Sequence, residues 1–205
     1  MKLKACFAAL TIISLILAAN AHADTYSTLQ TKRYYSANRR YFVEVTEKKR
    51  AILYHNSRRF RRIWTRILPE IPRELLVTND GSRVAMVDFY YGNNSDPNTP
   101  VVVIFGDEGK EIARYLLKDV ADLSRTTATT SMSYWYQDAK LMPNEPLLVI
   151  DTVVAKYERS KCGDVNSPED AEKMWEICMA TTPFEKLRFD MATGKLSSRE
   201  HIASR

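Results

Sequence analysis

Apolar and polar residues alternate along much of this chain with the period of two that is typical of β-strands. Residues 83–89 follow this pattern, and residues 101–105, which read VVVIF, form the continuous apolar run expected of a buried strand. Turn-forming residues separate these segments. The pattern predicts an all-β fold of mostly antiparallel, meandering strands, the clearest of them at 41–45, 50–54, 74–78, 83–89, 101–105, 111–116, 147–150 and 186–190.

A hairpin and one or two short helices interrupt the strands. Asp80-Gly81 stands between two predicted strands and indicates a tight turn, because glycine accepts a positive φ without a Cβ clash. Residues 118–123 predict a turn or two of helix. A longer helix is predicted to begin at Ser167, which can cap it, with Pro168 at its first position. Apolar residues then recur at helical spacing as far as Cys178.

The first 23 residues have the layout of a secretory signal peptide. Lys2 and Lys4 form a basic head, residues 7–19 are almost entirely apolar, and residues 21–23, Ala-His-Ala, supply a small-x-small cleavage pattern. A retained membrane anchor is the alternative, but a spanning helix needs roughly 20 apolar residues and this run is shorter. We therefore expect residues 1–23 to be cleaved, which would leave a periplasmic or secreted chain without a transmembrane segment.

Two cysteines, Cys162 and Cys178, would remain after cleavage. An oxidising compartment favours a disulfide between them, whereas a redox-active pair normally has the spacing Cys-x-x-Cys. We predict a structural bridge that closes a helical insertion near 162–178, within a single β-rich domain at 24–205. Two free thiols are the alternative.

The charge of the chain restricts its partners only weakly. The leader holds two of the 30 basic residues and none of the 25 acidic ones, so the mature net charge is 28 minus 25, or +3. A charge this small does not by itself imply a polyanionic partner. Together with the expected compartment, it argues against a nucleic-acid partner.

A weak internal repeat relates the first two groups of strands. Residues 36–45 and 77–87 each consist of a polar turn followed by a strand that ends in valine, and a second strand follows in both. Asn38 and Asn79 are 41 positions apart in this alignment. A third, degenerate copy covers 133–195. A period of roughly 40–45 residues is that of one four-stranded propeller blade.

This pattern resembles the blades of WD40-like, β-propeller-like repeat proteins of the bacterial envelope. The likeness covers residues 36–116 and the last predicted strand with its turn, 187–195. The chain lacks the Gly-His and Trp-Asp signatures of such blades, and it has room for at most three blades where propellers usually have 4–8. The resemblance implies propeller-like sheets in an open stack, with a simple β-meander as the alternative. It also implies a binding scaffold rather than a reaction, and it assigns no functional residue.

The sequence lacks the usual catalytic and metal-binding motifs. Only His55 and His201 would survive cleavage, too few for a zinc site or a His-based triad, and His201 lies in a tail expected to fray. No nucleophile elbow, phosphate loop or dinucleotide fingerprint is present. We therefore assign no catalytic residue, metal or cofactor. A hydrolase whose carboxylates meet in space is left open by the acids near strand ends, Asp88, Asp107, Glu108 and Asp151.

The most distinctive surface feature is the segment 58–67, RRFRRIWTRI, which has five arginines in nine positions. Read as a strand, its even-numbered residues from Phe60 to Arg66 share one face; read as a helix, it forms a basic amphipathic stripe. The neighbouring strands favour a strand. Arginine binds phosphate bidentately and a tryptophan is suited to an interface, so we predict contact with an anionic surface. The candidate binding residues are Arg58, Arg59, Arg61, Arg62, Trp64 and Arg66. The structural alternative is an edge strand that charge protects from aggregation.

These observations support two hypotheses. The first is a non-enzymatic β-protein of the periplasm or the exterior that binds an anionic envelope component or another envelope protein. The second is an envelope hydrolase that uses carboxylates on a β scaffold. The sequence indicates no oligomeric state.

Overall fold

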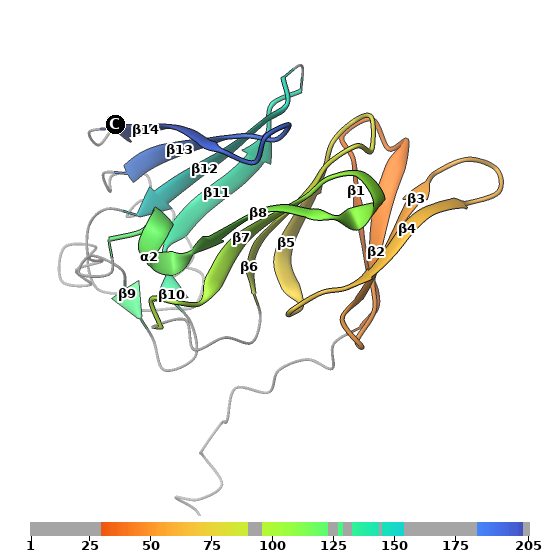
Figure 1. Ribbon diagram of the computed structural model, residues 1–205, viewed down its shortest axis with the longest axis horizontal. Helices are drawn as coiled ribbons and strands as arrows, with labels where there is room; N and C mark the ends of the chain where they lie inside the picture. The colour runs from red at the N-terminus through yellow and green to blue at the C-terminus, as the bar shows by residue number, and fades with distance from the viewer. Residues whose placement is uncertain are drawn as a thin grey trace, which may run out of the picture. The chain divides into compact units, whose positions relative to one another are not determined.

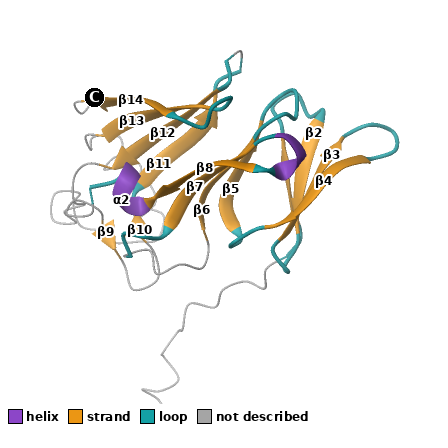
Figure 2. Ribbon diagram, in the orientation of Figure 1, coloured by secondary structure: helices purple, strands orange, loops and turns teal. Residues whose placement is uncertain are grey.

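Three four-stranded antiparallel sheets follow one another along the described part of the chain (Figures 1 and 2). The computed structural model describes residues 30–89, 96–122, 127–128, 133–143, 145–153 and 184–202. Within each sheet, every strand pairs with its neighbours in chain order. Sheet 1 contains β1 (Lys32–Tyr35), β2 (Tyr41–Val45), β3 (Arg50–His55) and β4 (Arg61–Ile67). Sheet 2 contains β5 (Pro72–Val77), β6 (Val84–Phe89), β7 (Pro100–Phe105) and β8 (Glu111–Leu116). Sheet 3 contains β11 (Tyr136–Leu141), β12 (Leu147–Val153), β13 (Phe184–Asp190) and β14 (Leu196–Ile202).

The remaining described elements are small. A single turn of 3₁₀-helix, η1 (Asp107–Gly109), links β7 and β8, and the short helix α2 (Leu117–Val120) follows β8. A two-residue pair, β9 (Thr127–Ala128) with β10 (Ser133–Tyr134), precedes sheet 3. The predicted all-β fold with propeller-like, four-stranded meanders and short helices is therefore confirmed.

The first hairpin of each sheet closes in the same way. A backbone N–H donates to the carbonyl five positions later, at Ser36, Thr78 and Met142, with N···O distances of 2.9, 3.1 and 2.9 Å. In sheets 1 and 2 the side chains match as well, because a hydroxyl donates to the Oδ1 atom of Asn38 or Asp80 two positions later. Asn38 therefore corresponds to Asp80, 42 positions later. The alignment of Asn38 with Asn79 was one residue out of register.

Asn38 and Asn79 instead bind each other, and they tie sheet 1 to sheet 2. The backbone N–H of Asn38 donates to Asn79 Oδ1 at 2.9 Å, and Asn38 Nδ2 donates to the Asn79 carbonyl at 2.8 Å. Gly81 lies next to this contact with a φ of +69°, and a Cβ at this position would lie 2.3 Å from the ring of Tyr41. The Asp-Gly hairpin is confirmed, and the glycine is needed both for its φ and for the close approach of the two sheets.

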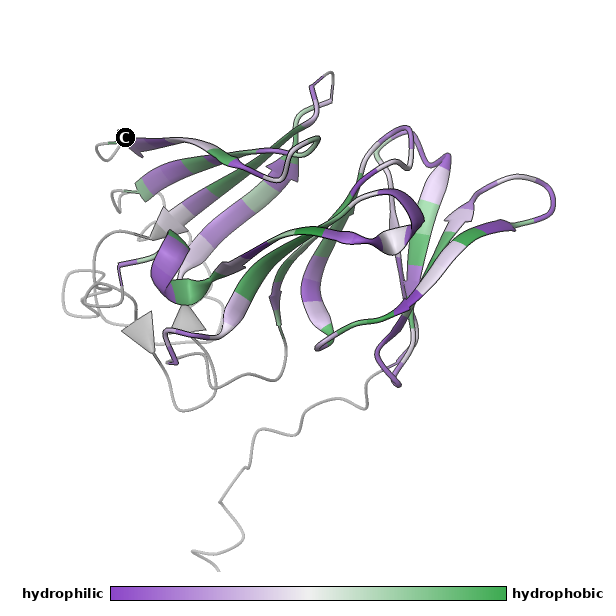
Figure 3. Cartoon of the chain, viewed as in Figure 1, coloured by the Kyte–Doolittle hydropathy of each residue, from purple (hydrophilic) through white to green (hydrophobic). Residues whose placement is uncertain are grey.

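Sheet 2 lies between the other two sheets and is buried on both faces. Along β6, Val84 and Met86 belong to a hydrophobic cluster shared with sheet 1, whereas Ala85 and Val87 belong to a cluster shared with sheet 3. Strand β7 divides in the same way, and both strands are coloured largely hydrophobic in Figure 3. Sheets 1 and 3 each contribute one face to these clusters. Each therefore has a second face, called here its outer face, that points away from sheet 2.

Several strands were missed or misplaced by the sequence pattern. The strands β1 and β11 were not predicted, and the third copy of the repeat was expected at 133–195, whereas sheet 3 spans 136–202. The segment Leu196–Ile202 is an edge strand paired with β13, so His201 lies opposite Glu185 in a ladder rather than in a frayed tail. This strand is rich in polar and charged residues, which hides it from a search for hydrophobic runs.

Other predictions fall outside the described residues. These are the leader at 1–23, the pair Cys162 and Cys178, and the helix expected at 167–178. The predicted helical turn at 118–123 corresponds to α2, which begins one residue earlier. Among the described residues, no helix combines the length and the hydrophobicity that crossing a bilayer requires.

Candidate functional site

The arginine-rich segment forms strand β4 and the bend before it, not a helix. A β-bulge interrupts the pairing of β4 with β3, since Leu53 lies opposite Trp64 whereas the next residue, Tyr54, lies opposite Arg62. Ile63 is the extra residue, and a bulge shifts the alternation of side chains by one position. The even-numbered residues from Phe60 to Arg66 therefore do not share one face, and this part of the strand prediction was wrong.

Trp64 and Arg66 point toward sheet 2. Trp64 is only 7% exposed and belongs to the cluster between sheets 1 and 2. The Cβ position of Gly109 in η1 lies 3.1 Å from the Trp64 ring and 2.7 Å from Arg66 Cγ. Arg66 Nε donates to the carbonyl of Glu108 at 3.2 Å. Both candidate residues therefore pack against η1, and Trp64 adds nothing to the exposed surface.

The other four candidate arginines lie together at the end of the β3–β4 hairpin. Arg58, Arg59, Arg61 and Arg62 are all exposed. The ion pairs formed among the described residues include none of these four guanidinium groups. Arg62 lies opposite Tyr54, which places it on the outer face of sheet 1. Within the described part of the chain, no carboxylate neutralises these four cations, which can therefore bind an external anion.

An aromatic cluster, which the sequence pattern did not reveal, covers the same outer face. Phe42 is at its centre and stacks on Tyr54, with ring centroids 5.0 Å apart and planes inclined by 21°. Phe60 meets the edge of Phe42 at 5.4 Å, and Tyr35 lies 5.3 Å from it. Phe42 is only 1% exposed as a result, although it points away from sheet 2. We call these four residues the aromatic cluster.

A fifth arginine, Arg33, joins the basic residues to the aromatic cluster. Its guanidinium carbon lies 5.3 Å from the ring centre of Phe42 and 5.8 Å from that of Phe60, within cation–π range. Arg33 Nε also donates to Glu44 at 2.8 Å, and this hydrogen bond raises the pKa of Arg33. Glu44 is thus already paired, so the described residues on the outer face of sheet 1 combine arginines and aromatic rings with one acidic side chain that is already neutralised.

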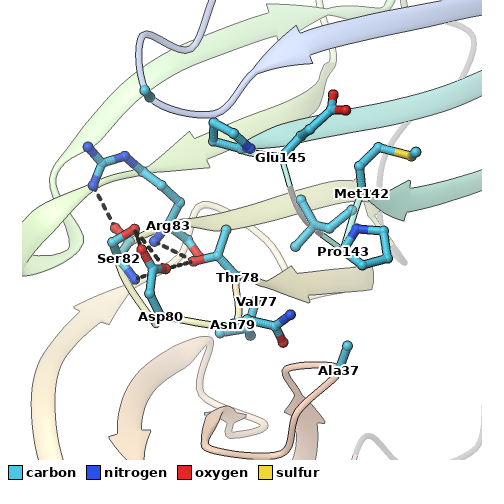
Figure 4. Close-up of a pocket in the computed structure, with 13 residues that line it drawn as sticks. Ala37, Val77, Thr78, Asn79, Asp80, Ser82, Arg83, Met142, Pro143 and Glu145 are labelled. Atoms are coloured by element: carbon cyan, nitrogen blue, oxygen red, sulfur yellow. Dashed lines mark hydrogen bonds between the residues drawn. The ribbon is translucent and has the colours of Figure 1, made fainter.

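A separate cleft of about 480 Å³ lies where the hairpin turns of the three sheets meet (Figure 4). Its wall includes Asp80 and Arg83 from the β5–β6 turn and Met142, Pro143, Glu145 and Pro146 from the β11–β12 turn. Most polar groups here bind one another. Partial burial acts to raise the pKa of Asp80, but hydrogen bonds from Thr78 and Ser82 lower it overall. Arg83 binds the carbonyl of Met191 and pairs with Asp107. These contacts of the lining residues therefore help to hold the turns together.

The carboxylates considered for a hydrolase do not come together. Asp88 lies near the end of β6. Asp107 follows the last residue of β7, Phe105, which pairs with Val84 at the start of β6. At roughly 3.3 Å per residue, the two carboxylates are therefore about 13 Å apart along the sheet. Asp151 alternates with the buried Ile150 and so lies on the outer face of sheet 3, where it pairs with Lys186. Glu108 lies beside Asp107 in η1, and its carbonyl binds Arg66. Within the described part of the chain, no group of three or more metal-binding side chains is found either.

Asp88 is nevertheless an unusual residue. It is buried, has a φ of +55°, and accepts a hydrogen bond from Arg73 Nη1 at 3.1 Å. Burial raises the pKa of Asp88, and Arg73 opposes this effect only in part. Buried carboxylates with raised pKa values are frequent at functional sites and also occur in structural ion pairs. Here the pair Arg73–Asp88 lies between the register pairs Pro72–Phe89 and Glu74–Val87 and joins β5 to β6, which is a structural role.

Comparison with known proteins gives no family for this chain. No family model matches it, and no curated protein matches it. Among solved structures, it is similar to Kuenenia stuttgartiensis hydrazine synthase, with 10% identity, a TM-score of 0.42, and coverage of 83% of this chain and 36% of that one. It is also similar to Saccharomyces cerevisiae Sqt1, with 9% identity, a TM-score of 0.41, and coverage of 88% and 38%. This chain thus spans less than two fifths of the length of either protein. The fold is defined here by the order and pairing of its own strands.

Proposed function

We propose that this protein is a non-enzymatic binding module of the cell envelope, periplasmic or secreted after loss of residues 1–23, that contacts an anionic component through sheet 1. The observation that carries the proposal is the set of four exposed arginines, Arg58, Arg59, Arg61 and Arg62, which have no carboxylate partner among the described residues. Natural surfaces usually intersperse charges of both signs. A concentration of unpaired arginine on one hairpin is suited to binding phosphate or carboxylate groups.

The separation of Asp88, Asp107 and Asp151 supports a binding role over hydrolysis. Paired-carboxylate glycosidases place their two acids roughly 5–10 Å apart. Asp88 and Asp107 lie about 13 Å apart along sheet 2, and Asp151 lies on the outer face of sheet 3, which points away from sheet 2. Turnover on a broad panel of glycans and esters that Asp88→Asn or Asp151→Asn abolished, without loss of folding, would overturn the non-enzymatic assignment.

Binding of soluble polyphosphate at low and high salt tests the proposal. Thr31–Arg205 forms one compact unit, so a protein that begins at Asp24 retains it. The arginine variant replaces Arg58, Arg59, Arg61 and Arg62 by serine. The lysine variant, its matched control, replaces four exposed lysines on sheets 2 and 3 or beside them, Lys110, Lys118, Lys140 and Lys195.

Both variants lose four positive charges, so they separate location from net charge. We expect the wild type and the lysine variant to bind polyphosphate with an affinity that falls as salt rises, because salt screens exposed charges. We expect the arginine variant to bind polyphosphate at least about tenfold more weakly. A tenfold loss corresponds to roughly 1.4 kcal/mol of binding free energy. Equal losses in the two variants would show that net charge alone is responsible and would contradict the proposal.

A further inference from the structure

We propose that the outer face of sheet 1 docks onto the surface of an anionic phospholipid bilayer. This inference rests on the proposed function and names the partner of that same surface. The four large hydrophobic residues that are exposed among the described residues all belong to sheet 1 or to its last hairpin. They are Tyr35, Phe60, Ile63 and Ile67, with exposed fractions of 47, 56, 42 and 71%.

At least three of these residues lie on the outer face itself. Tyr35 and Phe60 belong to the aromatic cluster, and Ile67 pairs with Arg50, which alternates with the buried Ala51. Phe60 is held against Phe42 and Tyr54 and therefore needs little ordering to present its exposed side. The aromatic cluster is thus a preformed apolar patch at one end of this face, with Ile67 at the other end of β4, and an exposed apolar patch is typical of a surface that meets a partner.

The charge around this patch identifies the partner as anionic. Arg62 and Arg50 lie on the same face by register, Arg33 lies over the rings of Phe42 and Phe60, and the free arginines at 58 and 59 come immediately before Phe60. Apolar side chains surrounded by arginines are the arrangement by which peripheral proteins bind the boundary between lipid headgroups and acyl chains. The arginines would bind headgroup phosphates while Phe60 and Ile67 entered the boundary.

A second copy of this chain is a poorer occupant of the same face. Two such faces in contact would oppose arginine to arginine, and like charges across an interface are unfavourable. An acidic protein would satisfy the arginines, but it does not account for the exposed apolar residues on the same face.

The test adds an apolar variant, Phe60→Ser with Ile67→Ser, to the wild type and the arginine variant. Both replaced side chains are more than half exposed, so the fold should be retained, which circular dichroism and the thermal midpoint would verify. The probes are vesicles of phosphatidylglycerol mixed with phosphatidylcholine, vesicles of phosphatidylcholine alone, and soluble polyphosphate. A fourth protein, Phe60→Trp, reports insertion through quenching of its fluorescence by lipids brominated on the acyl chains.

We expect the wild type to bind the anionic vesicles and not the neutral ones. The apolar variant should bind anionic vesicles about tenfold more weakly or worse, yet bind polyphosphate as the wild type does. The arginine variant should lose both interactions. Trp175, outside the described residues, is replaced by phenylalanine in both the reference protein and the Phe60→Trp variant. Phe60→Trp should then gain a quenchable fluorescence that the reference protein lacks, because Trp64 and Trp135 are buried.

Two results would overturn the bilayer inference. If the apolar variant binds vesicles like the wild type, or if Phe60→Trp is not quenched, the surface binds soluble or protein-borne anions, and the proposed function survives without the bilayer. If the apolar variant loses polyphosphate binding as well, Phe60 and Ile67 support the phosphate site rather than insertion. Failure of the wild type to bind any anionic probe would overturn both proposals.

Discussion

Sheets 1 and 3 flank the same buried sheet, and the contrast between their outer faces is informative. On sheet 3, three ion pairs cover the outer face: Asp151 with Lys186 at 3.6 Å, Arg188 with Glu200 at 3.3 Å, and Lys140 with Asp138 at 3.2 Å. On sheet 1, the aromatic cluster and Arg62 share the outer face, and Arg33–Glu44 is the one ion pair that the described residues form there. The outer face of sheet 3 satisfies its own charges, whereas that of sheet 1 keeps cations and apolar area available. Equivalent positions in the fold thus differ in what they can bind.

The largest expected effect concerns the packing of the two outer faces. Phe42→Ala should lower the free energy of unfolding by about 3–5 kcal/mol, because it removes the centre of the aromatic cluster. Val149→Ala, at a buried position on the outer face of sheet 3, should cost about 1–2 kcal/mol, because it removes less buried surface. Urea unfolding of the two variants makes the comparison. A loss below about 1 kcal/mol for Phe42→Ala would show that the aromatic cluster is not a packed unit.

The next largest expected effect concerns the ion pairs on the two outer faces. Lys186→Met should lower the free energy of unfolding by about 1–2 kcal/mol, since it leaves the half-buried Asp151 without its cation. Arg33→Met should lower the thermal midpoint less than Lys186→Met does, because solvent screens an exposed pair such as Arg33–Glu44. Thermal unfolding at neutral pH measures both. The reverse order would mean that the ion pairs of sheet 3 do not stabilise its outer face.

A smaller loss is expected where sheet 1 meets sheet 2. Asn38→Ala removes the side-chain bonds to the Asn79 carbonyl and to the turn of sheet 1, and should cost about 1 kcal/mol. Urea unfolding again gives the value, and Asn98→Ala, at an exposed position in the turn before β7, serves as a control. Equal stability of Asn38→Ala and wild type would contradict the role of this contact in joining the two sheets.

The smallest expected effect is a dependence of the unfolding free energy on pH, which arises from the interior pair Arg73–Asp88. Burial raises the pKa of Asp88 in the folded state above its unfolded value, so the folded protein binds the proton more tightly. The contribution of this group to stability is therefore greatest below the unfolded pKa, and it declines as pH rises through the folded pKa. Asp88→Asn should remove this decline from a series of urea titrations between acid and neutral pH. An unchanged slope would show that Asp88 does not titrate as described.

The sequence pattern predicted the strands with long apolar runs and missed those without them. Strand β7, reading PVVVIF, is buried on both faces and was readily predicted. Strand β14, reading LSSREHI, is mostly exposed and gains its conformation from pairing with β13, which no local pattern reveals. The repeat was visible at the turns of sheets 1 and 2 because polar side chains at matching positions close both hairpins.

The candidate site was predictable in its charge and not in its geometry. The arginines of 58–62 are evident from composition alone. The bulge at Ile63 turns Trp64 inward. It depends on the pairing of β4 with β3, so it cannot be recognised from the order of apolar and polar residues along β4 alone. Tyr35, Phe42 and Tyr54 come from three different strands, so the aromatic cluster exists only once the register of sheet 1 is fixed.

The most direct test of the account is the equilibrium binding of the wild type, the arginine variant and the lysine variant to phosphatidylglycerol-containing vesicles at low and high salt. The account predicts salt-sensitive binding that the lysine variant keeps and the arginine variant loses. Binding that the two variants lose equally, or that the arginine variant keeps, would contradict the central claim that sheet 1 carries the binding surface.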